Sequence, residues 1–439
     1  MAEDLLLPLL GYRDGNSKEE DDARIQQATS VHSDISYDQS LPAQHTYLGT
    51  DLDELSGRTV LEDDVILNLP LLSLPGVVLI PGQTLPLHLF QPPTVAMVKN
   101  IIDHDRTFGM VNSRYLGPNY MPSLAPIGTT AEIRSYKEEI EERSGLCTIR
   151  VKAEGRQRFQ IIDTRRQSDG ILLGQVKILS DIVLRDALEG ARSQSMLRFL
   201  KHPPREKSVS LDHDGHEFVL KNKLSKAKYD RLRPAHFTWW PPWVYKQYDQ
   251  EILMSRIKQE LIGWNNALKL DSMPRLASEF SFWVAANLPL DDTLRLNILA
   301  IDSPIQRLRC ELSILEKCTA LCCRDCDVEI TDKTDVFSMS IEGPQSIYVN
   351  PGGYVHETLT VHKVRSVRVQ GESSTEYSWF PGFAWSIVHC RSCGNHLGWK
   401  FTATDKNLKP DKFWGLCRSS LHPGIKNDNT GGDDWAPCI

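Results

Sequence analysis

Several patterns that would place this 439-residue chain in a common class are missing from it. No eighteen apolar residues run together, so we expect no membrane-spanning helix. The early apolar stretch LLLPLL is flanked by Glu3, Asp4 and Asp14 instead of basic residues, so we expect no signal peptide. The chain also has no GxxxxGK[ST] phosphate-binding loop, no HExxH motif and no recognisable Ser-His-Asp set, and ATPase or hydrolase chemistry of those types is therefore not indicated.

A large positive charge is missing as well. Residues 1–64 hold fifteen acidic and four basic residues, a net charge of −11, which leaves +4 for the rest of a chain whose total is −7. Residues 318–439 carry twelve basic and fourteen acidic residues. Because binding to phosphate backbones needs a positive excess, we expect neither nucleic acid nor an anionic membrane as a partner. Ten cysteines without a targeting segment favour a reducing compartment, the cytoplasm or the nucleus.

The composition changes along the chain, and at this length we expect a multidomain α+β fold. We predict that residues 1–64 form an acidic disordered tail, because their scattered apolar residues cannot bury enough surface to offset the entropy of ordering. Short apolar runs broken by prolines and polar turns predict a β-rich domain over residues 65–185, with one helix at PPTVAMVKNIIDHD. A short tail is assigned to residues 427–439.

Residues 186–317 have a helical period and are assigned to a helical bundle. Apolar residues recur at three- and four-residue steps from Leu253 to Leu268 and again from Ile305 to Leu315. Ser303 stands where an N-cap is expected, with a proline directly after it. The tryptophans of HFTWWPPWVYKQY are interpreted as core residues, and a partner-docking face is the alternative.

The cysteines predict a structural zinc site in an all-β domain at residues 318–426. Two CxxC pairs, Cys323 with Cys326 and Cys390 with Cys393, have the spacing that lets two thiolates point inward from one tight turn, and Gly394 follows the second pair. We expect one closed, tetrahedral zinc ion that pins two sheets together. The nearby Cys322 is a poorer fit to the CxxC spacing. The alternatives are four ordinary buried thiols or a redox CxxC pair.

Aromatic residues surround the second CxxC pair. YSWFPGFAW precedes it and GWKF follows it, so one metal-fixed turn would bring three tryptophans close together. Rigid indoles can wall a small dry pocket for a flat or cyclic ligand, or for a cation. The competing interpretation is that these tryptophans are core residues. His389 and His396, the nearest imidazoles, are interpreted as structural or surface residues.

Taken together, these motifs make the chain resemble the cereblon family. The phrases that carry the resemblance are VNPGGYVHETLTV, STEYSWFPGFAWS, the two CxxC pairs, GWKFTATDK and, upstream, LIPGQTLPLHLF, IGTTAEI and EGRQRF. They cover residues from about 65 to 425. The upstream domain is also similar to the N-terminal substrate-recognition domain of Lon proteases.

The resemblance implies a non-catalytic substrate receptor of a cullin-four RING ubiquitin ligase. In that family the helical segment docks on the DNA-damage-binding β-propeller adaptor, and the zinc-containing domain binds thalidomide-type glutarimide drugs and proteins that end in a cyclic imide. Substrates are presented for ubiquitination and proteasomal degradation. The resemblance places the ligand-binding positions at Asn350, Pro351, Tyr377, Ser378, Trp379, Trp385, Trp399 and Phe401.

Three positions depart from the family pattern. Tyr377 replaces the usual histidine, which would keep a backbone carbonyl contact and lose an imidazole contact. Phe383 replaces a common tyrosine and would remove a hydroxyl from the pocket wall. Ile387 is β-branched and would crowd the rim of the pocket. We expect imide binding to survive and drug-dependent recruitment of foreign substrates to be weakened.

One enzyme hypothesis stays open. The zinc-containing β fold is similar to that of B-type methionine sulfoxide reductases, and Cys417 lies in a suggestive neighbourhood, FWGLCRSS. Such an enzyme needs a reactive thiolate that points into the pocket.

Overall fold

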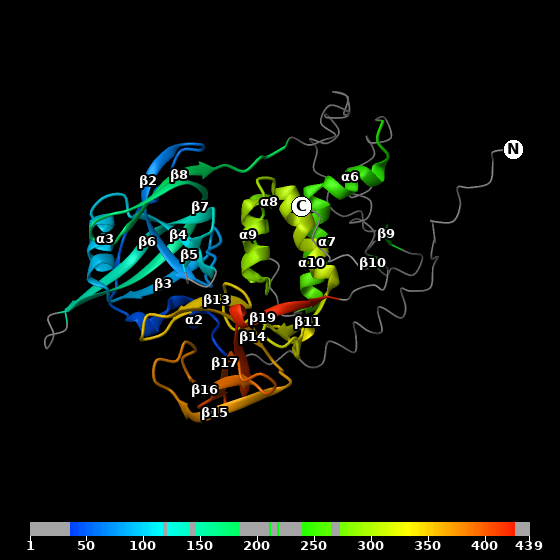
Figure 1. The fold of residues 1–439 in the computed structure, drawn as a ribbon. Coiled ribbons are helices and arrows are strands. Elements are labelled where there is room, and N and C mark those ends of the chain that lie inside the picture. The colour runs from blue at the N-terminus through cyan, green and yellow to red at the C-terminus, as the bar shows by residue number, and fades with distance from the viewer. Residues whose placement is uncertain are drawn as a thin grey trace.

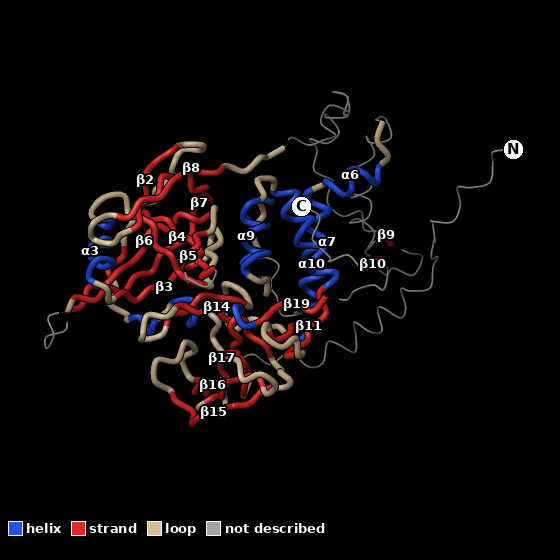
Figure 2. The backbone as a smooth tube through the Cα atoms, viewed as in Figure 1, coloured by secondary structure: helices blue, strands red, loops and turns tan. Residues whose placement is uncertain are grey.

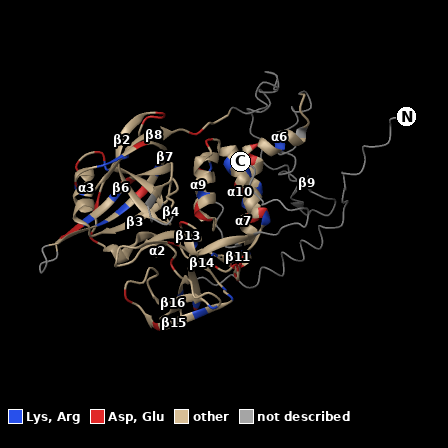
Figure 3. Ribbon diagram, in the orientation of Figure 1, with Lys and Arg blue, Asp and Glu red and all other residues tan. Residues whose placement is uncertain are grey.

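The computed structural model describes residues 36–116, 121–140, 146–184, 210–211, 217–218, 239–264 and 273–425. It confirms the multidomain α+β architecture, with a β domain, a group of helices and a C-terminal domain of β-sheets (Figures 1 and 2). No helix within these residues has the length and apolar content needed to cross a bilayer. Basic and acidic residues are scattered over all three parts (Figure 3).

The N-terminal β domain is closed on itself. Its long strands pair in the order β6, β4, β2, β8, β7, and β7 then pairs with β6. The pair β2–β4 is parallel, and the others around the ring are antiparallel. Short apolar alternation inside each strand gives one buried face, on which fully buried side chains such as Phe108, Ile133 and Phe159 pack. The elements are β1 (Asp53–Glu54), β2 (Ile66–Pro75), β3 (Thr84–Leu89), α3 (Pro92–Ile102), β4 (Thr107–Leu116), β5 (Met121–Leu124), β6 (Ile127–Ile140), β7 (Cys147–Arg166) and β8 (Leu172–Leu179).

The helices follow the apolar spacing of the sequence. They are α6 (Pro242–Tyr248), α7 (Gln250–Trp264), α8 (Ala277–Asn287), α9 (Asp292–Ala300) and α10 (Pro304–Lys317); a strand pair, β9 (Ser210–Leu211) with β10 (Glu217–Phe218), precedes them. Helix α10 packs against α7 and α8. Ser303 occupies the N-cap position of α10, but its side chain makes no capping hydrogen bond. Leu268 lies outside the described residues.

The interpretation of the tryptophan-rich turn as core is wrong. Trp239 is 100% exposed, Trp240 63% and Trp243 60%. Pro241 and Pro242 start α6 here, and this short helix lies at the edge of the helical group, next to α7 (Figure 1). Apolar content alone predicts burial, but it cannot tell a core from a face that a partner covers.

The C-terminal domain consists of two sheets. One has the order β12-β11-β19 and the other β13-β14-β18-β17-β16-β15. The strands are β11 (Cys318–Cys323), β12 (Glu329–Asp332), β13 (Gln345–Val349), β14 (Val355–Val361), β15 (Val367–Ser374), β16 (Phe383–Cys390), β17 (His396–Ala403), β18 (Lys412–Cys417) and β19 (Leu421–Ile425), with 3-10 turns η4 (Lys333–Asp335) and η5 (Arg418–Ser420).

Residues 36–64 correct the prediction of a disordered tail, whereas residues 1–35 lie outside the described part. The segment forms α2 (Ser40–Gln44) and η1 (Thr46–Leu48) and runs between the β domain and the C-terminal domain (Figure 1). Tyr37 is buried with its ring 5.3 Å from that of Phe383, and Lys152 donates to the carbonyl of Gln44. The segment has too few apolar residues to form a core of its own. These few apolar residues instead bury themselves against surfaces that the other domains supply.

Candidate functional site

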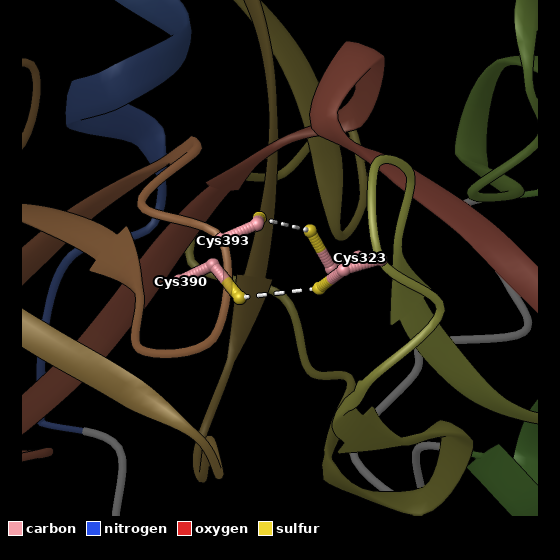
Figure 4. Close-up of side chains that lie close together, drawn as sticks. Cys323, Cys390 and Cys393 are labelled. Carbon is pink, nitrogen blue, oxygen red and sulfur yellow. Dashed lines mark hydrogen bonds between the residues drawn. The ribbon is translucent and has the colours of Figure 1, made fainter.

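The four predicted zinc ligands come together. Every sulfur atom lies within 4.8 Å of the others, and the closest pairs are Cys323 with Cys393 at 3.6 Å and Cys326 with Cys390 at 3.7 Å (Figure 4). A tetrahedron with Zn–S bonds of about 2.3 Å has edges of about 3.8 Å, so this arrangement fits zinc. Cys322 is not part of the cluster.

Each ligand pair sits on a tight turn. At the second turn, the amide of Gly394 donates to the carbonyl of Cys390 at 3.0 Å, and φ of Gly394 is +80°, a left-handed conformation that glycine adopts without strain. At the first turn, the amide of Asp327 donates to the carbonyl of Cys323 at 2.9 Å. The backbone amide of Val328 lowers the pKa of the Cys326 thiol to about 7, which favours the thiolate that a metal requires.

The cysteine cluster joins the two sheets, as predicted. The first turn follows β11 of the three-stranded sheet, and the second lies between β16 and β17 of the six-stranded sheet. Trp385 lies on β16 and Trp399 on β17, opposite Ile387. Cys390 lies five positions after Trp385 along β16, about 16 Å at the usual rise. A metal here would hold the end of the hairpin that carries the tryptophans without touching the pocket itself.

An aromatic pocket of about 530 Å³ opens beside this hairpin. We call it the tryptophan pocket; its walls are Asn350, Pro351, Tyr354, His356, Glu376, Tyr377, Trp379, Trp385, Ile387, His396, Trp399 and Phe401. The rings of Trp379 and Trp399 meet edge to face at 4.6 Å, and Tyr348 stacks behind Trp379 at 5.1 Å. The pocket is thus a rigid box of the size that small ligands occupy.

The indole N–H groups are used to build the box. Trp379 donates its N–H to the carbonyl of Val349 at 3.1 Å, and Trp385 donates to the carbonyl of Glu376 at 2.8 Å. Both bonds involve the loop between β15 and β16, which we call the Tyr377 loop. The first bond holds this loop to β13, and the second holds it to β16. Polar contacts with a ligand must therefore come from other groups.

The backbone of the Tyr377 loop supplies such groups. Tyr377 has φ of +53°, a left-handed conformation that is strained for a bulky residue, and its side chain is exposed. Among the described residues, neither the carbonyl of Tyr377 nor the amide of Trp379 is engaged by another protein group. One loop that borders the pocket thus has a backbone acceptor and a backbone donor, two residues apart, without protein partners among the described residues.

Seven of the eight predicted ligand positions line this pocket, and Ser378 does not: its hydroxyl donates to the carbonyl of Phe380 at 3.1 Å. The expectation for Phe383 also needs correction. Its side chain is buried in the aromatic core, packed against Phe413 and Tyr37, and it does not line the pocket. Although Phe383 lies two residues before Trp385 and therefore shares its face of β16, its ring packs into the aromatic core beside Phe413 and does not reach the pocket.

Sequence reasoning missed four wall residues: Tyr354, His356, Glu376 and His396. His396, interpreted from the sequence as a structural or surface residue, lies on the pocket wall. His356 and His396 each approach Trp399 edge to face at 5.0 Å. Burial lowers the pKa of His356 to about 4 and also lowers the pKa of His396, so both imidazoles are neutral at pH 7. The sequence YVHETLTV could have indicated His356, because it predicts a strand and His356 lies near the start of that strand.

Cys417 does not have the environment of a reactive thiol. It lies at the end of β18, opposite Thr358 of β14, and is 3% exposed. Burial raises the pKa of its thiol to about 12, and it is not among the pocket walls. These features do not favour a nucleophilic role.

Family models match two consecutive parts of this chain, and the first of them covers both the β domain and the helices. A family model described as ATP-dependent protease La (LON) substrate-binding domain matches residues 68–317, and one described as Yippee zinc-binding/DNA-binding /Mis18, centromere assembly matches residues 319–430. Among solved structures, a Lon N-terminal domain protein from Xanthomonas campestris aligns with 56% of this chain and 98% of its own, at 19% identity and a TM-score of 0.31.

Curated relatives align over nearly the whole chain. Protein cereblon of Gallus gallus is 47% identical over 407 residues, 92% of this chain and 89% of that protein. Protein cereblon of Xenopus tropicalis is 46% identical over 441 residues, 98% of this chain and 96% of that protein.

Proposed function

Because this chain belongs to the cereblon family, we propose that it is the non-catalytic substrate receptor of a cullin-four RING ubiquitin ligase and that its tryptophan pocket binds cyclic imides. The ligands would be glutarimide drugs of the thalidomide type and proteins that end in a cyclic imide. The receptor would act in the cytoplasm and the nucleus.

One observation carries the proposal: Trp379, Trp385 and Trp399 line a pocket bordered by a loop in which the carbonyl of Tyr377 and the amide of Trp379 have no partners among the described residues. A cyclic imide has an N–H donor next to a carbonyl acceptor on a flat ring edge, and both would be satisfied by this loop. The ring faces would then contact Trp385 and Trp399. A ring-opened ligand carries a carboxylate, which is costly to bury without a partner among indoles.

The zinc cluster supports this pocket indirectly. Bound at Cys323, Cys326, Cys390 and Cys393, one zinc ion would supply a structural crosslink and no reaction chemistry. The turn between Cys390 and Cys393 joins β16 to β17, so the crosslink would keep Trp385 and Trp399 at a fixed separation.

The helical segment offers a face for the adaptor. We propose that residues 186–317 dock on the DNA-damage-binding β-propeller, and the exposed rings of Trp239 and Trp243 support this. Exposed tryptophans are rare on a free surface and common at the centre of protein interfaces. A receptor docked in this way raises the effective concentration of substrate lysines near a ubiquitin-charged enzyme held elsewhere on the assembly.

Titration of a glutarimide into the full-length protein tests the ligand. We expect saturable binding in the micromolar range, with a change in tryptophan fluorescence because three indoles line the pocket. The matched control is the same compound after hydrolytic ring opening, which should not bind. Lack of glutarimide binding, or equal binding of the ring-opened acid, would contradict the proposal.

Residues at the rim of the tryptophan pocket would affect the recruitment of a protein by a bound drug. Ile387 lines the pocket and is 36% exposed, and Tyr377 is 64% exposed beside it. A drug-recruited protein would have to seat against these two side chains. We therefore propose that such recruitment is weakened although imide binding is retained, and that Ile387→Val would strengthen the ternary complex without changing imide affinity.

A further inference from the structure

Strand β15 leaves one edge of the six-stranded sheet without a partner. The sheet ends in β13 on one side and in β15 on the other. Strand β13 packs against β3 of the β domain, whereas no described strand pairs with the outer side of β15, which lies at the margin of the molecule (Figure 1). Most residues of β15 are exposed. We call this outer side the open edge, and such an edge can accept an added strand.

The backbone of Val369 points to the open edge. The amide of Arg391 donates to the carbonyl of Ser366 at 2.8 Å, so Ser366 faces β16. Backbone groups alternate along an antiparallel ladder, so Arg368 also faces β16, whereas the N–H and C=O groups of Val367 and Val369 face outward. Val369 is 45% exposed. The open edge therefore offers a donor and an acceptor on each of two residues.

The open edge lies next to the tryptophan pocket. Ile387 of the pocket wall is paired with Trp399 on one side and with Gln370 of β15 on the other. Paired residues share a face of the sheet, so Gln370 and, two residues before it, Arg368 lie on the same face as the pocket. An added strand would lie two strand spacings, about 10 Å, from β16, a distance that roughly three residues of extended chain can cover.

Arg368 gives this face a positive charge beside the open edge. Its side chain is exposed, and it forms no ion pair with another described residue, whereas Arg365, three residues earlier, is paired with two acidic side chains. The acidic residues Glu372 and Glu376 come later in the chain, after the shift of register that follows Gln370. An acidic side chain on the pocket face of an added strand would lie beside Arg368, and opposite charges on neighbouring strands attract each other.

We propose that the open edge of β15 binds, as an added strand, the polypeptide segment that precedes the C-terminal imide of a substrate, and that Arg368 favours an acidic residue in this segment. The inference rests on the proposed function, because the imide in the tryptophan pocket anchors the chain. With its C-terminal end beside Gln370 and its chain running back toward Val367, the added strand would be parallel to β15. The N–H and C=O groups of Val369 would then each bond to it.

The length of the open edge favours an anchored chain over a second folded partner. Only Val367 and Val369 present outward groups before the ladder shifts its register. Pairing with two residues buries far less than the roughly 1,000 Å² that a stable complex of two folded proteins needs. A chain whose imide already occupies the pocket makes the second contact within one complex, so a few backbone bonds are enough to add affinity. A glutarimide drug has no such segment and would gain nothing from β15.

A fluorescein-labelled alanine hexapeptide that ends in the cyclic imide of glutamine tests the backbone contact. Fluorescence anisotropy with the full-length protein gives its Kd, and competition with glutarimide gives the affinity of the imide alone. Val369→Pro removes the outward N–H and no bond to β16, and an edge strand tolerates proline at such a position. We expect it to weaken the peptide by about tenfold, the scale of one or two hydrogen bonds, and to leave glutarimide affinity unchanged. Val369→Thr keeps the N–H and should bind both ligands as the wild type does.

Peptides with glutamate or lysine at the third to fifth positions before the imide test the charge. The wild type should bind the glutamate peptides about threefold more tightly, and added salt should reduce this preference. Arg368→Glu should reverse the preference without changing glutarimide affinity. Arg165→Glu, at an exposed position of β7, makes the same change of charge far from the pocket and should keep the wild-type preference.

Methylation of the peptide's backbone nitrogens needs no protein variant and should weaken the peptide as Val369→Pro does. Equal binding of methylated and unmethylated peptides, undiminished peptide binding by Val369→Pro, or an unchanged preference in Arg368→Glu would each overturn the proposal. A dimer of the free protein that Val369→Pro dissociates would assign the open edge to a second copy of this chain and would also overturn it. If the wild type binds neither glutarimide nor the peptide, the proposed function fails; if it binds both with equal affinity, only this inference fails.

Discussion

Glu357 of β14 and Arg295 of α9 form an ion pair that is buried between the C-terminal domain and the helices. The second carboxylate oxygen of Glu357 pairs with Arg418, which also pairs with Asp292 at 2.6 Å. All four side chains are buried. Buried charges persist only when each is paired, so the position of the C-terminal domain on α9 is fixed by this network.

Glu357→Gln should therefore be strongly destabilising. Removing one charge leaves Arg295 and Arg418 buried without an anion between them, which costs about 3 to 5 kcal/mol in the free energy of unfolding. Urea unfolding of the variant measures this loss. Glu372→Gln, at an exposed position of β15, is the matched control and should change stability by less than about 0.5 kcal/mol. Similar effects of the two substitutions would show that the network does not hold the domains together.

Trp385→Ala should remove imide binding and spare the rest of the protein. The substitution deletes one wall of the tryptophan pocket and the hydrogen bond to the carbonyl of Glu376 that holds the Tyr377 loop. We expect glutarimide affinity to fall by about a hundredfold, the usual scale for a central aromatic contact. Zinc content and adaptor docking should stay at the wild-type level.

Trp243→Ala should have the opposite effect to Trp385→Ala. Trp243 is exposed on α6, outside the pocket. Its removal should weaken adaptor docking, measured by co-purification, and leave glutarimide binding intact. Loss of both activities in either variant would contradict a modular receptor.

Local patterns predicted most of the molecule. The CxxC spacing was enough to find all four cysteines of the cluster and to prefer Cys323 over Cys322, because ligand geometry within one turn is set by a few neighbouring residues. The helix from Pro304 to Lys317 was likewise visible as a period of apolar residues. Both features are decided within one element.

Features decided between elements were not predictable in this way. Tyr37 is buried only because Phe383, far along the chain, presents a surface to it. His356 and His396 reach the pocket because β14 and β17 are brought together around β18. Trp243 is exposed although its side chain is as apolar as that of the buried Trp264. Composition and period carry no information on which distant segment covers which face.

Substitution of a zinc ligand and substitution of a neighbouring cysteine should have different effects on the protein. Cys393→Ser should remove the metal, because three thiolates and a hydroxyl bind zinc far more weakly, and should unfold the hairpin end that carries Trp385 and Trp399. Glutarimide binding is then lost, while the β domain at residues 65–185 keeps its own core. Zinc content by elemental analysis and proteolytic protection of the β domain are the measurements. Cys322→Ser, next to a ligand but outside the cluster, should keep both zinc and imide binding, and loss of zinc there would reassign the ligand.

The buried carboxyl of Glu311 should make the stability of the protein depend on pH. Its side chain is fully buried in α10, and neither carboxyl oxygen has a hydrogen-bond partner among the described residues. Burial raises its pKa well above the ordinary value of 4.5, and the charge of Arg307 offsets this only in part. Below pH 4.5 the carboxyl is protonated in both the folded and the unfolded state. As the pH rises above 4.5, the unfolded state ionises first, so the contribution of Glu311 to stability is lost progressively until the folded pKa is reached.

Glu311→Met should consequently stabilise the protein at neutral pH, by about 1 to 3 kcal/mol, since methionine fills a similar volume without a polar group to bury. The gain should shrink toward pH 4.5, where the wild-type carboxyl no longer favours the unfolded state. Thermal unfolding of both proteins at several pH values measures the difference. Glu316→Gln, on the exposed side of the same helix, removes only a surface pair with Arg256 and should show no such trend. A gain that did not vary with pH would mean that Glu311 is destabilising through its shape and not through its charge.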